Sequence, residues 1–451
     1  MIKIEKVKNR PVYDITVNKN HNFYANDILV HNCAEIVEFT GVSELQKDIL
    51  NNKELLDSVG LSEFYDTESV NETAVCNLAS ISLPKFVNKN KTYNFNKLYD
   101  VAYQATINLN NVIDVNFYPS KAAKFSNLLH RPIGLGVQGL ADVFFIIGLS
   151  YDSDEAKILN RQIFETIYFA SMRASCDLSK IHGPYATYQG SPISKGEFQF
   201  DLWGTIPTDR WDWKKLREDV IKYGVRNSLT TCIMPTASTA SILGNEASCE
   251  AQTSNLYSRR VISGEFILVN KYLVKELVKL GIWNDNIKNK IISQNGSVQN
   301  IPEISTNLKE VYKTVWEIKQ KDVIDMASDR GAFIDQTQSM NIFMDNVNFG
   351  KLTSMHFYGW GRRSFMVDNN GKSIIPENDI NCQIVCDKDG TPRFYRDRRS
   401  NLKTGMYYLR TKSAADAVKF TIQKEEKSIE EQMEEISCSL SDPDSCISCG
   451  S

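Results

Sequence analysis

Long amphipathic helices alternating with short apolar runs constrain the fold of this chain more than any other pattern. The stretch from Ser153 to His182 has a capping serine, acidic residues in its first turn and Gly183 directly after it, which predicts one long helix. Helical spacing also covers Asn94 to Asp114 and Leu308 to Arg330. Short apolar runs lie between these segments, so we expect a layered α/β fold.

Two of the apolar runs carry small or reactive residues. Val75 to Leu83 is predicted to be a buried strand with Cys76 within it. Arg131 to Asp142 contains several glycines, but their spacing does not fit a dinucleotide-binding loop, and no acidic residue follows a second strand. We therefore expect a tight strand-to-helix approach that requires small side chains there.

A run of small hydroxyl residues follows a third apolar segment. It reads Pro235, Thr236, Ala237, Ser238 and Thr239, within Arg226 to Gly244. Such a run can open a helix, and its backbone N–H groups and hydroxyls could hold an anion, phosphate above all. The alternative is a capped helix with spare hydroxyls, and the sequence leaves both interpretations open.

Composition excludes several classes of protein. The chain has 451 residues, which suggests two or three domains. A formal net charge of -3 gives no reason to expect binding to nucleic acid or to a membrane surface, and no apolar run is long enough to span a bilayer. Ten cysteines, three of them in the last fourteen residues, indicate redox or catalytic thiols in a reducing cytoplasm.

The last hundred residues differ from the rest. Residues 361–401 are polar with turn signals, which predicts one or two exposed hairpins, and the pair Cys382 and Cys386 lacks the partners that a metal site needs. Tyr407 and Tyr408 are adjacent, so in a strand one should be buried and the other exposed. From about residue 424 the chain is acidic and ends in Cys446-x-x-Cys449, which suits thiol–disulfide exchange on a mobile tail.

The residues up to Cys33 suggest a different chemistry. Asn32 can attack its own backbone carbonyl and break the chain, and the Cys33 thiolate can accept an acyl group. His31 beside this bond and His21 upstream can move protons near neutral pH. Alternation from Ile28 to His31 predicts a strand that holds the junction.

This region resembles the C-terminal splicing region of inteins, through Val12-Tyr13-Asp14, His21-Asn22-Phe23-x-Ala25-Asn26 and His31-Asn32-Cys33. The resemblance implies that Asn32 cyclises with help from His31, that His21 and Asp14 assist, and that Cys33 is the acceptor. Since the N-terminal part of an intein is missing, it implies a split intein that splices in trans. An ordinary strand-turn-strand is the alternative interpretation.

The rest of the chain resembles the large subunit of class I ribonucleotide reductases of the eukaryote-like type. The resemblance rests on six motifs, apart from the region 361–401: Cys33-Ala-Glu-Ile, Ala74-Val-Cys-Asn-Leu-Ala-Ser80, Pro132 to Ala141, Pro235-Thr-Ala-Ser-Thr239, Leu402-Lys-Thr-Gly-Met-Tyr-Tyr-Leu-Arg410 and the terminal Cys-x-x-Cys-Gly-Ser.

Five of these six motifs, all except Pro132 to Ala141, imply a role in reducing ribonucleoside diphosphates. Cys33 corresponds to the thiyl radical that removes the ribose 3′ hydrogen, Glu35 to the carboxylate that takes the 3′-hydroxyl proton, and Cys76 to one cysteine of the reducing pair. Ala34 and residues Pro235 to Thr239 correspond to substrate-binding positions. Tyr407 and Tyr408 correspond to the stacked pair that relays the radical, and Cys446 and Cys449 to the tail that re-reduces the active site.

The resemblance also implies fold and partners. Residues 1–32 would be an all-β intein (Hint-type) fragment, residues 33–423 the second half of a ten-stranded α/β barrel with an insertion near 361–401, and residues 424–451 a redox tail. The implied partners are the N-terminal intein and reductase fragment, the small subunit with its diiron-type cofactor, thioredoxin or glutaredoxin, and a second copy after splicing. ATP and dNTP effectors would bind the missing half, and this fragment would bind no cofactor or metal. A glycyl-radical or cobalamin-dependent relative and a non-catalytic binding or decayed fragment are the alternatives.

Overall fold

A computed structural model gives the structure of the chain. It describes, with gaps, part of the sequence between residues 22 and 412, in these ranges: 22–25, 28–31, 40–42, 46–65, 67–261, 264–359, 362–363, 382–386, 392–397, 402–403 and 406–412. The predicted domain boundaries at residues 32 and 423 and the redox tail lie outside these ranges.

Five parallel segments form one sheet within the described residues. β5 (Asn77–Ser82) pairs with β6 (Ile133–Gln138), and single bridges continue the pairing from Leu135 to Thr231 and from Ile233 to Gln338. β9 (Asn341–Phe343) then pairs with β13 (Tyr408–Arg410). The order is therefore β5, β6, residues 230–234, residues 336–343 and β13, which is the number of strands that half of a ten-stranded barrel requires.

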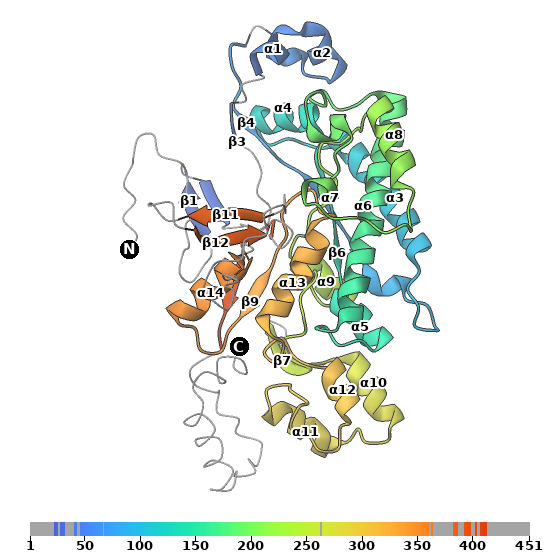
Figure 1. Ribbon diagram of the computed structural model, residues 1–451, viewed down its shortest axis with the longest axis vertical. Helices are drawn as coiled ribbons and strands as arrows, with labels where there is room; N and C mark the ends of the chain where they lie inside the picture. Colours follow the sequence, from blue (N-terminus) through green and yellow to red (C-terminus); the bar gives the residue numbers. More distant parts are fainter. Residues whose placement is uncertain are drawn as a thin grey trace.

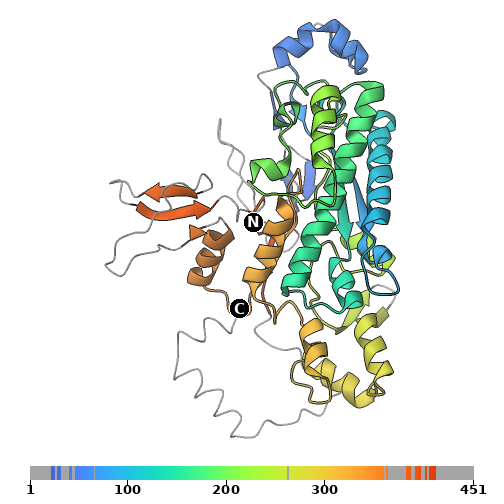
Figure 2. The same ribbon diagram turned by 45° about the vertical axis from the view of Figure 1, so that its right-hand side comes forward.

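Two long helices cover one face of this sheet, as Figure 1 and Figure 2 show. α3 (Phe95–Val115) and α6 (Asp154–His182) pack against each other, and α3 also contacts β5 and β6. Every residue of β6 is buried, so this strand is covered on both faces. Such burial is typical of strands in parallel α/β sheets.

The predicted long helix of residues 153–182 is confirmed with its ends. The Ser153 side chain accepts a hydrogen bond from the backbone N–H of Ala156, and the Gly183 N–H donates to the carbonyl of Ser179. The helix of residues 94–114 is confirmed as α3, with Asn94 as its N-cap. Local capping signals were therefore sufficient to place both elements.

The single helix predicted for residues 308–330 is wrong. The structure has α12 (Thr306–Val311) and α13 (Gln320–Gly331) instead. Residues 308–330 contain no glycine or proline, and the helix is interrupted by tertiary hydrogen bonds instead. The Val315 N–H donates to the carbonyl of Gln252 at 2.7 Å, and the Gln320 amide donates to the carbonyls of Val315 and Ile318. These bonds replace the helical ones, while Val315 and Ile318 are buried in the core.

A helical excursion lies beyond one end of the sheet (Figure 1). It runs between β3 (Thr40–Gly41) and β4 (Glu72–Thr73), which pair antiparallel, and consists of α1 (Gln46–Asn51), α2 (Lys53–Ser58) and the 3-10 turn η1 (Ser62–Phe64). The buried Gln46 side chain bonds both backbone groups of Val70. Buried Glu72 binds His130 at 2.7 Å, which fixes the base of the excursion to α4 (Lys121–His130).

The remaining helices and hairpins surround the sheet. They are α5 (Leu140–Ile147), α7 (Gln199–Leu202), α8 (Trp213–Tyr223), α9 (Ala237–Leu243), α10 (Lys271–Lys279), α11 (Asp285–Ser293), α14 (Phe349–Gly359), the turns η2 (Leu83–Phe86) and η3 (Pro192–Lys195), and the hairpin of β7 (Leu256–Val261) with β8 (Gly264–Val269). No helix in the described ranges combines the length and the apolar character that crossing a membrane requires.

Two antiparallel strand pairs test the strand expected before the junction and the hairpins expected in residues 361–401. β1 (Asn22–Ala25) and β2 (Ile28–His31) pair antiparallel, which confirms the strand expected before the junction. In the region 361–401, β11 (Cys382–Cys386) and β12 (Pro392–Asp397) form an antiparallel pair, and β10 (Arg362–Arg363) joins them. One hairpin is therefore confirmed in this region, and residues 364–381 lie outside the described residues.

Candidate functional site

The predicted site residues fall into two groups. Those that lie outside the described residues are Asp14, His21, Asn32, Cys33, Ala34, Glu35, Cys446 and Cys449. His31 is the last residue of β2, where it pairs with Asn22 through the backbone. The structure places Cys76, the segment from Pro235 to Thr239 and the pair of Tyr407 and Tyr408, and these define the candidate site.

Cys76 lies directly before β5 and not within a buried strand as predicted. It is partly buried, and its sulfur lies 3.8 Å from the side-chain amide nitrogen of Gln336, which donates to it. Leu78, expected in the core, is 50% exposed. The faces of β5 are incompletely covered, since Ile81 is the one buried residue of this strand and its side chains alternate between the two faces of the sheet.

Two glycines of β6 make room for sulfur-containing side chains, which confirms the predicted need for small residues. A Cβ at Gly134 would lie 2.5 Å from the Cys232 sulfur and 2.8 Å from the Cys76 sulfur, and one at Gly136 would lie 2.5 Å from the Met234 sulfur. After β6, Gly139 has a φ of +81° and opens α5 beside Pro84. The strand-to-helix turn is therefore packed closely on both sides.

Substitution of Gly134 by alanine is expected to destabilise the fold. The new methyl group would overlap two thiols and the Leu78 side chain, so the free energy of unfolding should fall by about 1–3 kcal/mol. Gly350 in α14 provides the control, because its Cβ would approach only the Asn348 side-chain oxygen, at 3.4 Å. Urea unfolding of both variants measures the difference. Equal stability of Gly134→Ala and the parent would contradict the packing described.

The hydroxyl run opens a helix, as predicted. Thr236 is the N-cap of α9 with a left-handed φ of 51°, and its hydroxyl accepts a hydrogen bond from the Ser248 N–H at 2.8 Å. Ala237, Ser238 and Thr239 are exposed in the first turn, where helical N–H groups have no intrahelical partner. The geometry is compatible with both the anion-binding and the capped-helix interpretation.

A polar network that the sequence did not reveal joins this helix to the ends of β5 and β6. The Asn245 amide donates to the Ser82 hydroxyl at 2.9 Å and lies 3.5 Å from the Gln138 side-chain oxygen. The Gln138 amide in turn donates to the Ser80 hydroxyl. These contacts place α9 at the carboxyl ends of the strands, which is where open α/β sheets bind ligands.

Two partly buried carboxyl groups, which no sequence motif indicated, follow α9. Burial, and secondly the nearby Asp142 carboxylate, raise the pKa of Glu246 to about 7. Burial raises the pKa of Glu250 to about 7 as well. Asp142 accepts a hydrogen bond from the Glu246 N–H at 2.7 Å. Carboxyl groups with pKa values close to neutral can give or take a proton at physiological pH.

The two tyrosines form a contact pair and do not point to opposite faces as strand geometry predicted. Their hydroxyls are 3.1 Å apart and their ring centroids 4.0 Å apart, with 51° between the ring planes. Both side chains are partly buried. Strand alternation fails here because β13 begins only at Tyr408, while the Tyr407 N–H donates to the Met340 carbonyl at 2.8 Å.

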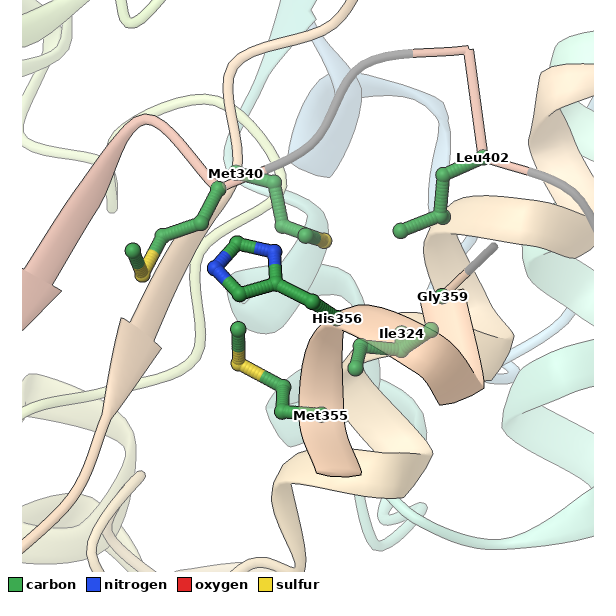
Figure 3. Close-up of a pocket in the computed structure, with 7 residues that line it drawn as sticks. Ile324, Met340, Met355, His356, Gly359 and Leu402 are labelled. Atoms are coloured by element: carbon green, nitrogen blue, oxygen red, sulfur yellow. The ribbon is translucent and has the colours of Figure 1, made fainter. Parts of the chain in front are cut away.

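A cavity of about 230 Å³ is lined by residues of the segments that lead into this pair (Figure 3). Its lining includes Met340 and Met406, and Met406 directly precedes Tyr407. The other lining residues are Ile324, Met355, His356, Gly359 and Leu402. Within the ranges that the structure covers, no group of three or more histidine, cysteine, aspartate or glutamate residues is arranged to hold a metal ion.

Comparisons with known proteins agree on one family. The family model described as "Ribonucleotide reductase, barrel domain" matches residues 3–364, a range that includes most of the segment expected to splice. A ribonucleoside-diphosphate reductase large subunit from Arabidopsis thaliana is 45% identical over 449 residues, covering 90% of this chain and 50% of the relative. Large chain 2 from Saccharomyces cerevisiae is 50% identical over 368 residues, covering 80% and 38%.

Among solved structures, the alpha subunit of a class Id ribonucleotide reductase from Actinobacillus ureae aligns with a TM-score of 0.49 at 25% identity, covering 69% of this chain and 54% of that chain. The chain spans about half the length of the curated relatives it matches. The family match covers well over half of the 451 residues. The parallel sheet and the family match lead to one conclusion, which is that this chain belongs to the ribonucleotide reductase barrel-domain family.

Proposed function

We propose that this chain supplies the C-terminal part of a class I ribonucleoside-diphosphate reductase large subunit, which converts ribonucleoside diphosphates to deoxyribonucleotides for DNA synthesis. The observation that carries the proposal is the link between Cys76 and the tyrosine pair. Gln336 donates to the Cys76 sulfur, and Met340 on the same segment accepts the Tyr407 N–H. One strand segment thus connects a reducing thiol with a pair of redox-capable phenols.

Each group has a defined part in the proposed reaction. Tyr407 and Tyr408 pass an oxidising equivalent from the diiron-type cofactor of the small subunit to Cys33, and the Cys33 thiyl radical removes the ribose 3′ hydrogen. Glu35 takes the 3′-hydroxyl proton, and Cys76 with a partner in the N-terminal half supplies two electrons. The segment from Pro235 to Thr239, which includes the exposed first turn of α9, holds the diphosphate together with Ala34, because hydroxyl groups and the N–H groups at a helix start favour an anion.

The remaining partners follow from the same scheme. Cys446 and Cys449 would re-reduce the active-site disulfide and be recharged by thioredoxin or glutaredoxin, in the cytoplasm. The N-terminal half would carry the ATP and dNTP effector sites, and the joined subunit would form a homodimer. The names of the similar proteins, which are ribonucleoside-diphosphate reductase large subunits, support the substrate class.

Protein trans-splicing is proposed as the step that joins the two halves. The β1–β2 hairpin ends at His31, directly before Asn32, so a paired strand leads into the bond to be cut. In this scheme Asn32 cyclises with help from His31, while His21 and Asp14 assist. Cys33 first accepts the N-terminal half and then becomes the radical-bearing residue.

Mixing the chain with a matching N-terminal intein and reductase fragment tests this proposal. Mass spectrometry should find a ligated product that contains residues 33–451 and a released peptide that ends in succinimide at Asn32. The Asn32→Ala variant should give no ligated product, because the chain can no longer cyclise. Asn18→Ala is the matched control and should ligate like the parent. Ligation by Asn32→Ala at the parental rate would exclude the splicing mechanism.

A further inference from the structure

Two thiols meet above Gly134. A Cβ built on this glycine would lie 2.5 Å from the Cys232 sulfur and 2.8 Å from the Cys76 sulfur. Both sulfurs therefore point into the same small space, and they are separated by no more than the sum of these two distances. The thiols come from the two segments that flank β6, so the missing side chain of Gly134 is what lets them approach.

The two thiols differ in access. Cys76 precedes β5, is partly exposed and receives the Gln336 amide at 3.8 Å. Cys232 is 0% exposed, and its N–H donates to the Leu135 carbonyl within the sheet. An oxidant from solvent would therefore reach Cys76 first, and Cys232 would be positioned behind it. An accessible cysteine with a second cysteine next to it is the arrangement in which the second can resolve a sulfenic acid on the first.

We infer that Cys76 and Cys232 form a redox-active dithiol within this half of the molecule, which closes to a disulfide when a peroxide oxidises Cys76. The Cys76 thiol loses its proton, and the thiolate attacks one oxygen of hydrogen peroxide and breaks the O–O bond. The released hydroxide takes up the proton, so a sulfenic acid and one water are formed. The Cys232 thiol then attacks the sulfenic sulfur, which forms the S–S bond and releases a second water. Two thiols thus lose two electrons in total, and one peroxide takes them up.

Closure requires a movement that the fold permits. A disulfide brings two Cα atoms to about 4.4–6.8 Å, whereas segments separated by a central strand are farther apart than that. Cys76 lies outside the β5–β6 ladder, which begins at Asn77, so it can move toward Cys232 without breaking a strand pair. The space over Gly134 is the path for this movement, because no Cβ obstructs it.

Among the cysteines whose side chains the structure describes, the other two are not among the nearest neighbours of this space. Cys176 lies on α6, and Cys249 follows α9 with its carbonyl bound by the Tyr151 hydroxyl. Both are buried. The pairing of Cys76 with Cys232 is therefore specific, and it does not depend on splicing or on nucleotide reduction. In the proposed reductase it would give Cys76 a second partner, which preserves the thiol from irreversible oxidation.

Oxidation of the intact, unligated chain tests the inference. The reduced chain is treated with one equivalent of hydrogen peroxide, its thiols are blocked with N-ethylmaleimide in denaturant, and a non-reducing digest is mapped by mass spectrometry. The dominant linked product should join the peptides that contain Cys76 and Cys232, and dithiothreitol should release both. Cys76 found as a sulfinic acid, or joined mainly to Cys33 or to a tail cysteine, would overturn the inference.

Two variants and a control separate specific pairing from general reactivity. Cys232→Ala should lose the linked product and accumulate Cys76 sulfinic acid, because no thiol captures the sulfenic acid. Gly134→Ala keeps both thiols but fills the space between them, and it should also lose the product. Cys249→Ala, another buried cysteine, should behave like the parent. Retention of the linked product by Gly134→Ala, in a folded variant, would show that the space over this glycine is not the path.

Discussion

Replacing Tyr408 with phenylalanine in the ligated subunit is expected to reduce nucleotide turnover at least ~100-fold, which corresponds to about 3 kcal/mol of activation free energy. The proposed relay needs a phenol at this position, because phenylalanine has no O–H to oxidise. Packing should change little, since the ring that lies 4.0 Å from Tyr407 is retained. Turnover is measured as deoxynucleotide formed in the presence of the small subunit.

Tyr99→Phe is the matched control for this experiment. Tyr99 is a partly buried tyrosine in an aromatic cluster with Trp211, on a helix far along the chain from the pair. It should retain parental turnover. If Tyr408→Phe reduced nucleotides at the rate of Tyr99→Phe, the hydroxyl contact of 3.1 Å between Tyr407 and Tyr408 would have no part in radical transfer. The assignment of the pair would then be wrong.

A partly buried ammonium group should make stability depend on pH in the alkaline range. Lys403 lies four residues before Tyr407, and its Nζ donates to the carbonyl of Ile334 and to the Gln199 side chain. Burial, opposed by the charge of Asp335, lowers the pKa of Lys403 from 10.5 to about 8. Because the folded-state pKa lies below the unfolded value, the unfolded state binds more protons between the two values, and stability rises with pH there.

The expected gain from this group is about 2 kcal/mol between about pH 7.5 and about pH 9.5. It is isolated as the difference in unfolding free energy between the parent and Lys403→Met, which cancels the titration of other groups. Lys412→Met is the control, since Lys412 is an exposed lysine paired with Asp345. Urea unfolding across this pH range should give a rising difference for Lys403→Met and a flat one for Lys412→Met. A flat difference for both would mean that the Lys403 ammonium is solvated in the fold.

The sequence predicted those elements whose signals are local. Ser153 and Gly183 fix the two ends of α6 through caps, and glycine at 134 and 136 implied close packing that the structure confirms. The helix of residues 308–330 was predicted wrongly because the carbonyl of Gln252, distant in sequence, competes for the Val315 N–H. No periodicity within the segment itself could reveal this competitor.

The candidate site shows the same division. Its residue types and motifs could be recognised, but their placement depended on long-range contacts. Strand alternation predicted that Tyr407 and Tyr408 lie on opposite faces, but the two rings are in contact because β13 begins only at Tyr408. Cys76 and Cys232 are far apart in the chain, and their sulfurs lie close together because Gly134, on a third segment, has no Cβ. The residue types that carry the proposed chemistry could therefore be predicted more easily than which of these residues lie close together.

β5 and β13 lie at the two ends of the strand order, and this position affects how the chain would associate with the N-terminal half of the proposed subunit. Within the described part, each of these strands has a strand partner along one side only, β6 for β5 and β9 for β13, so the backbone row on its other side lies at an edge of the sheet. Strands from another polypeptide can add to such rows and hold the two chains together before any covalent bond exists. The peptide ends to be joined would then react at the high effective concentration of a tethered pair. In this view, pairing of the sheet edges brings the two chains together before they are ligated. Substitutions that weaken pairing along either edge strand should therefore slow ligation more than they lower the stability of the ligated subunit.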